Sequence, residues 1–310
     1  MYIGLSRPPT PAYPAHDVDG AFVAKVVEEL GFESLFYGEH PITPVGGPGK
    51  LVHSAGVPFF QDPLVTLARA SAVTSRLTLG SAVFLIPVHQ PVLFAKQLAS
   101  LDFYSGGRII LGAGVGWNRV ETEVMGGNFD RRWAQARESI QLMKLLWTEE
   151  ITEFHGEFFS VPPVRLHPKP AQKPWPPVLL PGPFDGGVSV KSDRALAAFR
   201  RIATFADGWL PAFIGKTRMR EGAAEVAQGR KMMEQVCADM GRNPDELQVC
   251  VLLRTEIHDG DAGWPAERAD RDILRRYEDI GVERVIVTIP TLTGETQAKG
   301  VLERLAEELL

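Results

Sequence analysis

Two side chains able to exchange protons stand next to each other in the segment YGEHP. Glu39 and His40 directly follow a short apolar run, residues 33–38, of the kind that forms a buried strand. Histidine gains or loses a proton near neutral pH, so a histidine at a strand end is a candidate general acid or base. The alternative is that His40 only caps or packs the turn. Residue type and position leave both interpretations open.

Glycines crowd a second segment, GGRIILGAGVGWNRVE. Gly112, Gly114 and Gly116 resemble a dinucleotide-binding turn, but Trp117 occupies the place of the third glycine that such a turn requires. The pattern predicts the next helix only near residue 130, so the nicotinamide fingerprint is excluded. Either the glycines let the strand turn sharply, or they let a flat ring or a phosphate approach the backbone.

Two further strand ends carry small or turn-forming residues. In LTLGSAVFLIP, Ser81 and Ala82 are small enough to permit close approach by a planar ligand. In PVLLPGP, Pro181 and Gly182 could present backbone to a phosphate, although proline lacks an N–H. A helix start near Ser192 would favour an anion there, and the alternative is an ordinary capped helix.

Other chemistries find little support. The Lys216 segment GKT is no phosphate-binding loop, because Leu210 holds the place of its upstream glycine. The chain has no H-E-x-x-H, no G-x-S-x-G and no histidine pair at metal-ligand spacing, so we predict neither a metal site nor a serine hydrolase. A net charge of −5 without a basic stripe argues against a nucleic-acid partner.

The elements that must position these residues alternate along the whole chain. Nearly every strand pattern is continuous and apolar, as in a parallel sheet buried on both faces. We predict strands over residues 2–6, 33–38, 77–87, 108–114, 177–182, 208–213, 247–257 and 284–290. The fold class is therefore α/β, a (β/α)8 TIM barrel that forms one domain over residues 1–310, with an open doubly wound sheet as the rival. In such a barrel, function collects at the carboxyl ends of the strands.

The alternation of strand and helix patterns is interrupted once, over residues 151–177. A hairpin with its turn at His155 and Gly156 is followed there by a proline-rich connector. We predict a small surface insertion between strands four and five. Elsewhere, Asp17 is expected to cap the first helix, and Arg108 to pair with a carboxylate near its strand start.

The expected surroundings are those of a cytoplasmic protein. The N-terminus lacks a basic region followed by an apolar run, and no apolar run approaches the roughly 20 residues of a membrane span. Cys237 and Cys250 lie among apolar neighbours without C-x-x-C spacing. We predict two buried thiols, with a disulfide as the alternative.

Taken together, these segments resemble the bacterial-luciferase-like flavin oxidoreductases, most closely the group of probable coenzyme F420-dependent oxidoreductases. The resemblance covers roughly residues 30–213. The segments that carry it are ELGFESLFYGEHPITP, RLTLGSAVFLIP with the helix after it, GGRIILGAGVGWNRVE, the 151–177 region with PVLLPG, and ATFADGWLPAF. It implies the luciferase-like TIM barrel, with a cofactor ring lying over the ends of strands two, three and four.

The resemblance also implies roles for individual residues. His40 would be catalytic, transferring a proton or stabilising a charged intermediate. A bulge in the third strand would carry a non-prolyl cis peptide behind the ring, at Ala82–Val83 by motif position. The implied cofactor-binding residues are Glu39, Ser81, Ala82, Val83, Gly114, Trp117, Leu180, Pro181 and Gly182. Trp117 departs from the sugar-phosphate-oxidising relatives, which carry a glutamate there, and extra residues after Pro183 put phosphate binding in doubt.

The implied activity is hydride transfer between coenzyme F420 and a small organic substrate. The alternative is a reduced-FMN monooxygenase served by a separate flavin reductase. Two further hypotheses are a non-catalytic flavin-binding protein and a metal-dependent barrel hydrolase using His40. Phe59, Phe60, Trp117 and Phe184 suggest a partly apolar substrate. The resemblance further implies a homodimer formed through barrel helices.

Overall fold

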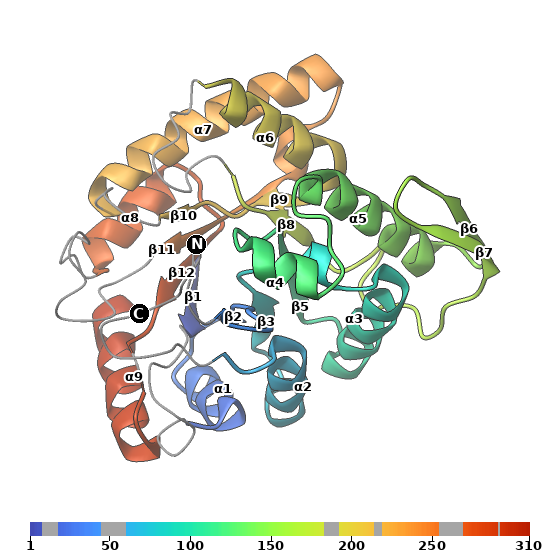
Figure 1. Ribbon diagram of the computed structural model, residues 1–310. Helices are drawn as coiled ribbons and strands as arrows, with labels where there is room; N and C mark the ends of the chain where they lie inside the picture. The colour runs from blue at the N-terminus through green and yellow to red at the C-terminus, as the bar shows by residue number, and fades with distance from the viewer. Residues whose placement is uncertain (8–17, 45–59, 183–191, 214–218, 254–268, 291) are drawn as a thin grey trace.

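The chain folds into a closed barrel of parallel strands surrounded by helices (Figure 1). The computed structural model describes residues 1–7, 18–44, 60–182, 192–213, 219–253, 269–290 and 292–310. The barrel strands are β1 (Tyr2–Arg7), β2 (Ser34–Tyr37), β3 (Thr78–Ser81) with β4 (Phe84–Leu85), β5 (Ile109–Gly114), β8 (Val178–Leu180), β9 (Gly208–Trp209) with β10 (Ala212–Phe213), β11 (Gln248–Leu253) and β12 (Arg284–Thr288).

Closure of the barrel is visible in the strand pairing. β1 pairs in parallel with β2 on one side and with β12 on the other, and the remaining pairings run from β2 around to β11 and β12. The eight predicted strand positions are therefore confirmed, and the open doubly wound sheet is excluded because no edge remains between β1 and β12.

Within the described ranges, eight helices of nine residues or more form the outer layer (Figure 1). They are α1 (Gly20–Glu29), α2 (Pro63–Val73), α3 (Pro91–Ser105), α5 (Arg132–Thr148), α6 (Asp193–Phe205), α7 (Met219–Met240), α8 (Arg271–Asp279) and α9 (Glu295–Leu309). On α5, Ala136, Ile140, Met143 and Trp147 recur at helical spacing and are buried, because that face packs against the barrel. None of the helices in the described ranges is both long and apolar enough to cross a membrane.

The apolar residues divide into two cores. The larger core lies between strands and helices. The smaller core fills the barrel interior and contains Phe36, Ile110, Leu179, Leu210, Cys250, Leu252 and Ile286. Ala82 and Val83 pack against this inner core while remaining partly exposed, so they close the barrel interior at the carboxyl end of β3.

Three local expectations need correction. The side chain that caps α1 is Asp19, whose Oδ1 accepts a hydrogen bond from the Ala21 N–H at 2.9 Å, whereas Asp17 lies outside the described residues. Arg108 donates to backbone carbonyls of a preceding turn, including Leu77 O at 2.7 Å, rather than to a carboxylate. The third correction is a short helix, α4 (Arg119–Val124), that begins directly after the glycine segment.

The helix α4 begins where it does because Asn118 caps it. The Asn118 side chain accepts a hydrogen bond from the Glu121 N–H at 3.3 Å, which satisfies one of the free amides of the first turn. The sequence analysis missed this helix because six residues are too few to show an apolar repeat. In Figure 1, α4 lies over the barrel strands, inside the ring of longer helices.

The insertion between strands four and five is confirmed as a hairpin. β6 (Thr152–His155) and β7 (Ser160–Val164) pair antiparallel, and the Gly156 N–H donates to Phe159 O across the turn at 2.9 Å. The hairpin projects from the side of the barrel beyond α5 (Figure 1). Cys237 and Cys250 are both buried free thiols, so the disulfide alternative is excluded.

Candidate functional site

The third barrel strand is interrupted where the site is expected. β3 ends at Ser81 and β4 begins at Phe84, and the intervening Ala82–Val83 peptide bond is cis, as the resemblance implied. The Ala82 N–H donates to Tyr37 O at 2.8 Å, which fixes this bulge against the end of β2. The bulge therefore lies beside the backbone that leads into Glu39 and His40.

The glycines after β5 explain how this bulge fits. A Cβ on Gly112 would overlap the carbonyl oxygen of Ser81, and a Cβ on Gly114 would overlap Cγ2 of Val83. Ser81 also donates from its hydroxyl to Gly112 O at 2.9 Å. Close packing between neighbouring strands is thus one reason for the glycines. The predicted contacts of Ser81 and Gly114 with a cofactor stay predictions.

His40 lies at the carboxyl end of β2 with one nitrogen engaged. Its Nδ1 is 3.0 Å from both carboxylate oxygens of Glu121 on α4. The Glu121 side chain is 0 % exposed and the His40 side chain 14 % exposed. The chain therefore presents a partly accessible imidazole whose inner nitrogen faces a buried carboxylate.

Two aromatic rings meet the His40 ring edge to face. The centroid of Phe60 lies 4.8 Å from it and that of Trp117 lies 5.9 Å from it. Trp117 is 49 % exposed, so one of the two rings in contact with His40 reaches the surface. These contacts restrict rotation of the imidazole and make its surroundings apolar. Phe59 and Phe184, also predicted to wall the pocket, lie outside the described residues.

Glu39 is engaged with the bulge instead of pointing into open space. One carboxylate oxygen accepts the Leu85 N–H at 2.6 Å, and His89 Nε2 lies 3.0 Å from both oxygens. The His89 ring stacks on Phe94 with centroids 4.0 Å apart. Glu39 thus joins the end of β2 to the segment that follows the cis peptide. Its implied contact with a cofactor ring stays a prediction.

The predicted phosphate end of the site is only partly described. The Leu180 side chain is buried in the outer core, so a ligand contact would have to use its backbone. Gly182 packs against Trp209, where a Cβ would overlap the indole Nε1. Pro181 is partly exposed, and Ser192 caps α6 by accepting the Ala195 N–H at 3.2 Å. Phosphate binding at this end stays a prediction.

The structure also brings in a residue that the sequence analysis missed. Glu121 lies 81 positions after His40, and no spacing rule connects the two. The available signal was local: an asparagine cap at Asn118 with glutamate three residues later is a typical helix start. That pattern would have predicted α4, although not that the glutamate turns inward to His40.

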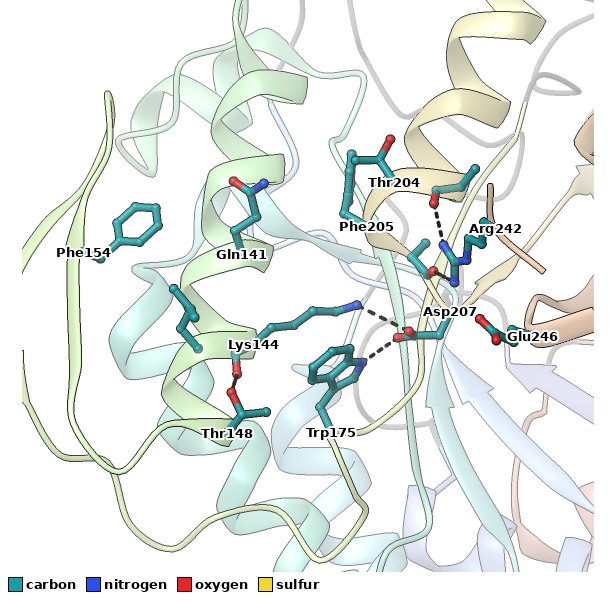
Figure 2. Close-up of a pocket in the computed structure, with 13 residues that line it drawn as sticks. Gln141, Lys144, Thr148, Phe154, Trp175, Thr204, Phe205, Asp207, Arg242 and Glu246 are labelled. Atoms are coloured by element: carbon teal, nitrogen blue, oxygen red, sulfur yellow. Dashed lines mark hydrogen bonds and ion pairs between the residues drawn. The ribbon is translucent and has the colours of Figure 1, made fainter. Parts of the chain in front are cut away.

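A separate hollow of about 670 Å³ lies at the amino-terminal end of the barrel strands, between α5, α6 and the connector before β8. Figure 2 shows Lys144 and Trp175 both directed at Asp207. Trp175 Nε1 donates to Asp207 Oδ2 at 2.9 Å, and Lys144 Nζ lies 3.4 Å from Oδ1. Burial lowers the pKa of Lys144, and the Asp207 charge opposes that shift.

Lys144 and Trp175 both bind the Asp207 carboxylate. Because Trp175 belongs to the 151–177 insertion, these contacts indicate that Asp207 holds the insertion to the barrel. Asp207 Oδ2 also accepts the Val178 N–H at 2.9 Å, and Arg242 donates to carbonyls at the end of α6. Residues at the amino-terminal end of a TIM barrel usually contribute to stability and not to catalysis. Among the described residues there is also no cluster of histidine, cysteine and carboxylate side chains able to hold a metal.

Comparisons with known proteins show the family of this chain. The family model described as luciferase-like monooxygenase matches residues 19–300. The uncharacterized protein Rv0953c of Mycobacterium tuberculosis is 32 % identical over 296 residues, which cover 93 % of each chain. An FMNH2-dependent dimethylsulfone monooxygenase of Pseudomonas putida is 35 % identical over 133 residues, 42 % of this chain and 35 % of its own.

Solved structures agree on the fold. The monooxygenase RslO1 of Streptomyces bottropensis superposes with a TM-score of 0.74 at 19 % identity, covering 100 % of this chain and 98 % of its own. An F420-dependent secondary alcohol dehydrogenase, solved with an F420–acetone adduct, gives 0.72 at 13 % identity with the same coverage. Proteins named for F420 and proteins named for FMN are therefore both among those that this chain is similar to. The chain belongs to the family of luciferase-like monooxygenases and oxidoreductases.

Proposed function

We propose that the protein is an oxidoreductase that uses coenzyme F420, a deazaflavin, with a small and partly apolar organic substrate. The observation that carries the proposal is the pairing of His40 with Glu121, at the end of the strand whose Tyr37 carbonyl accepts a hydrogen bond from the Ala82–Val83 bulge. When bound, the deazaflavin supplies or accepts a hydride. Reduction of a carbonyl or imine then also needs a proton, and His40 is able to provide one.

The residues around the bulge fit a flat aromatic group. Ala82 and Val83 offer a partly exposed apolar surface above the inner core, without a charged side chain of their own. A planar ring covers such a surface with favourable burial of apolar area. We therefore infer that Ala82 and Val83 support the ring, with His40 and Trp117 at its edge.

The residues of this chain would divide the remaining work. His40 holds or moves the proton at its Nε2, since Nδ1 faces Glu121. Phe60 and Trp117 limit the access of water to that nitrogen and favour an apolar substrate. Glu39 keeps the bulge in place through Leu85 and His89.

A second candidate function is monooxygenation with reduced FMN. It is supported by the local identity to the FMNH2-dependent enzyme of Pseudomonas putida. In that case the proton site of His40 would serve an oxygen-dependent reaction, and a separate reductase would supply reduced flavin. A non-catalytic flavin-binding protein is a third hypothesis, which requires binding without turnover.

The deciding experiment is a parallel binding titration of the purified protein with F420 and FMN, each oxidised and reduced, followed by tryptophan fluorescence. Trp117 stands beside His40, so a ring bound there should quench its emission, and Trp117→Phe should reduce the quenching without abolishing binding. Selective tight binding of F420 supports the proposal. Selective binding of reduced FMN would replace it with the monooxygenase, and binding of neither would contradict both.

A further inference from the structure

The carboxylate of Glu121 is buried against a single described partner. Both oxygens lie 3.0 Å from His40 Nδ1, and the side chain has no exposed surface. Within the ranges that the structure describes, no other group donates a hydrogen bond to it. A carboxylate removed from water is costly unless it is paired, so the contact with His40 must be a strong one.

The pairing determines where the proton of the imidazole lies. An ionised carboxylate only accepts hydrogen bonds, so Nδ1 must carry the hydrogen that it receives. Nε2 is consequently the nitrogen that gains or loses a proton, and among the described residues it has no hydrogen-bond partner.

The surroundings of His40 support a functional reason for this arrangement. Phe60 and Trp117 contact the imidazole by ring edges and offer it no hydrogen bond, so they do not select between its tautomers. Among the residues that the structure describes, only Glu121 hydrogen-bonds the imidazole and so selects a tautomer. The helix that carries Glu121 is itself held by the Asn118 cap, which fixes where the carboxylate can lie.

We propose that Glu121 is the positioning residue of His40: it fixes the tautomer with hydrogen on Nδ1 and leaves Nε2 as the nitrogen available to a bound cofactor or substrate. This inference rests on the proposed function for the use made of the Nε2 proton, but the tautomer itself does not depend on which cofactor binds. Glu121 acts through His40 and does not need to touch substrate.

The first test reads the tautomer directly. Nitrogen NMR of full-length protein labelled with 15N-histidine needs no cofactor, and His40→Ala identifies the His40 signals. We expect a protonated Nδ1 and, above the titration of the ring, an unprotonated Nε2. Glu121→Ala should lose this preference, while Glu121→Gln, which keeps an oxygen acceptor, should retain part of it. A native spectrum with hydrogen on Nε2 and none on Nδ1 would overturn the proposal.

The second test separates positioning from a merely structural role. Glu121→Ala should lower kcat by about tenfold or more and change KM by less than about twofold, with partial recovery in Glu121→Gln. Glu123→Gln is the matched control, because Glu123 is exposed on the same helix and pairs with Arg119. A lower melting temperature in Glu121→Ala with unchanged kcat would contradict positioning.

The two proposals fail separately. The NMR result decides the role of Glu121 even if the binding titration favours FMN over F420, because it is recorded without either. Kinetics are then measured with whichever cofactor binds. If Glu121→Ala does not fold, the nearly isosteric Glu121→Gln is used for both the NMR measurement and the kinetics. The proposal would be overturned if folded Glu121→Gln kept the native tautomer and had the same kcat as the Glu123→Gln control.

Discussion

At the scale of single residues, adjacent positions perform different tasks. His40 places a partly exposed imidazole against Glu121, while the Glu39 carboxylate is buried and engaged by Leu85 and His89. Glu39 and His40, which are adjacent in the sequence, therefore do not act as one acid–histidine pair: each has partners of its own.

Replacing His40 tests the proton role. His40→Ala should reduce kcat about 100-fold or more, because general acid–base groups contribute rate factors of roughly 10² to 10⁴. Binding of the cofactor should weaken far less, since the apolar surface of the bulge is unchanged. Steady-state kinetics and the fluorescence titration measure the two effects. His155→Ala, in the exposed hairpin, is the control, and equal turnover in His40→Ala would refute the assignment.

Replacing Glu39 tests the buried link. Glu39→Ala leaves the Leu85 N–H without its partner and removes the partner of His89, and we expect a loss of about 2–3 kcal/mol in the free energy of unfolding. Glu39→Gln keeps an oxygen for Leu85 and should lose less. Denaturant unfolding measures both. Glu29→Ala, at an exposed position of α1, should change stability little, and a similarly small effect in Glu39→Ala would contradict the link.

At the scale of elements, the site depends on the fit between two neighbouring strands. The bulge after β3 occupies space that β5 leaves free by having glycine at positions 112 and 114. The short helix α4 then continues from the same strand and returns Glu121 to the end of β2. One segment of chain therefore makes room for the Ala82–Val83 bulge and supplies the partner of His40.

Adding one methyl group to β5 should disturb this fit. Gly114→Ala would force Val83 to move, with an expected cost of about 1–3 kcal/mol and weaker cofactor binding. Val83→Ala removes the methyl groups in its way, so the double variant should recover part of the loss. Thermal unfolding and the binding titration measure this recovery.

The matched control for that variant lies in α9. Gly300 has no neighbouring atom within 4 Å of an added Cβ, so Gly300→Ala should stabilise the helix by up to about 1 kcal/mol. If Gly114→Ala were as harmless as Gly300→Ala, the close approach of β5 to Val83 would not limit the site.

At the scale of the whole molecule, buried polar contacts join distant parts of the barrel. Arg284 on β12 donates two hydrogen bonds to Glu33 before β2, each 2.8 Å long, across 251 residues of sequence. Burial alone would raise the pKa of Glu33, but the hydrogen bonds and charge of Arg284, assisted by Thr78, lower it below its usual value. This pair joins the start of β12 to the residue before β2, past the start of β1, which lies between those two strands.

The Glu33 pair predicts how stability depends on pH. Because the folded pKa of Glu33 is lowered, its contribution is fully present above the unfolded value near 4.3 and is lost as pH falls through the folded pKa. Glu33→Gln should therefore cost about 2 kcal/mol at pH 7, and the difference from the native protein should shrink in acid. Denaturant unfolding at pH 7 and below pH 4 measures it. A difference independent of pH would contradict the assignment.

The sequence by itself determined the order of elements. Apolar runs alternating with helical stripes predicted all eight barrel strands and the hairpin insertion, because hydrophobic periodicity is local information. It also placed His40 at a strand end, whereas the bulge at Ala82–Val83 was implied by the resemblance to a known family. The limits of α1 and the existence of α4 escaped it, because a single capping residue decides short or marginal helix ends.

Only the tertiary structure decided which side chains meet. Glu121 reaches His40, and Glu39 reaches Leu85 and His89, across 46 to 81 residues of intervening chain. No local pattern encodes these contacts, since they arise from closing the barrel and bringing the ends of β2, β3 and β5 to one side. The sequence thus shows which residues can exchange a proton, whereas only the folded barrel determines which side chain orients each of them.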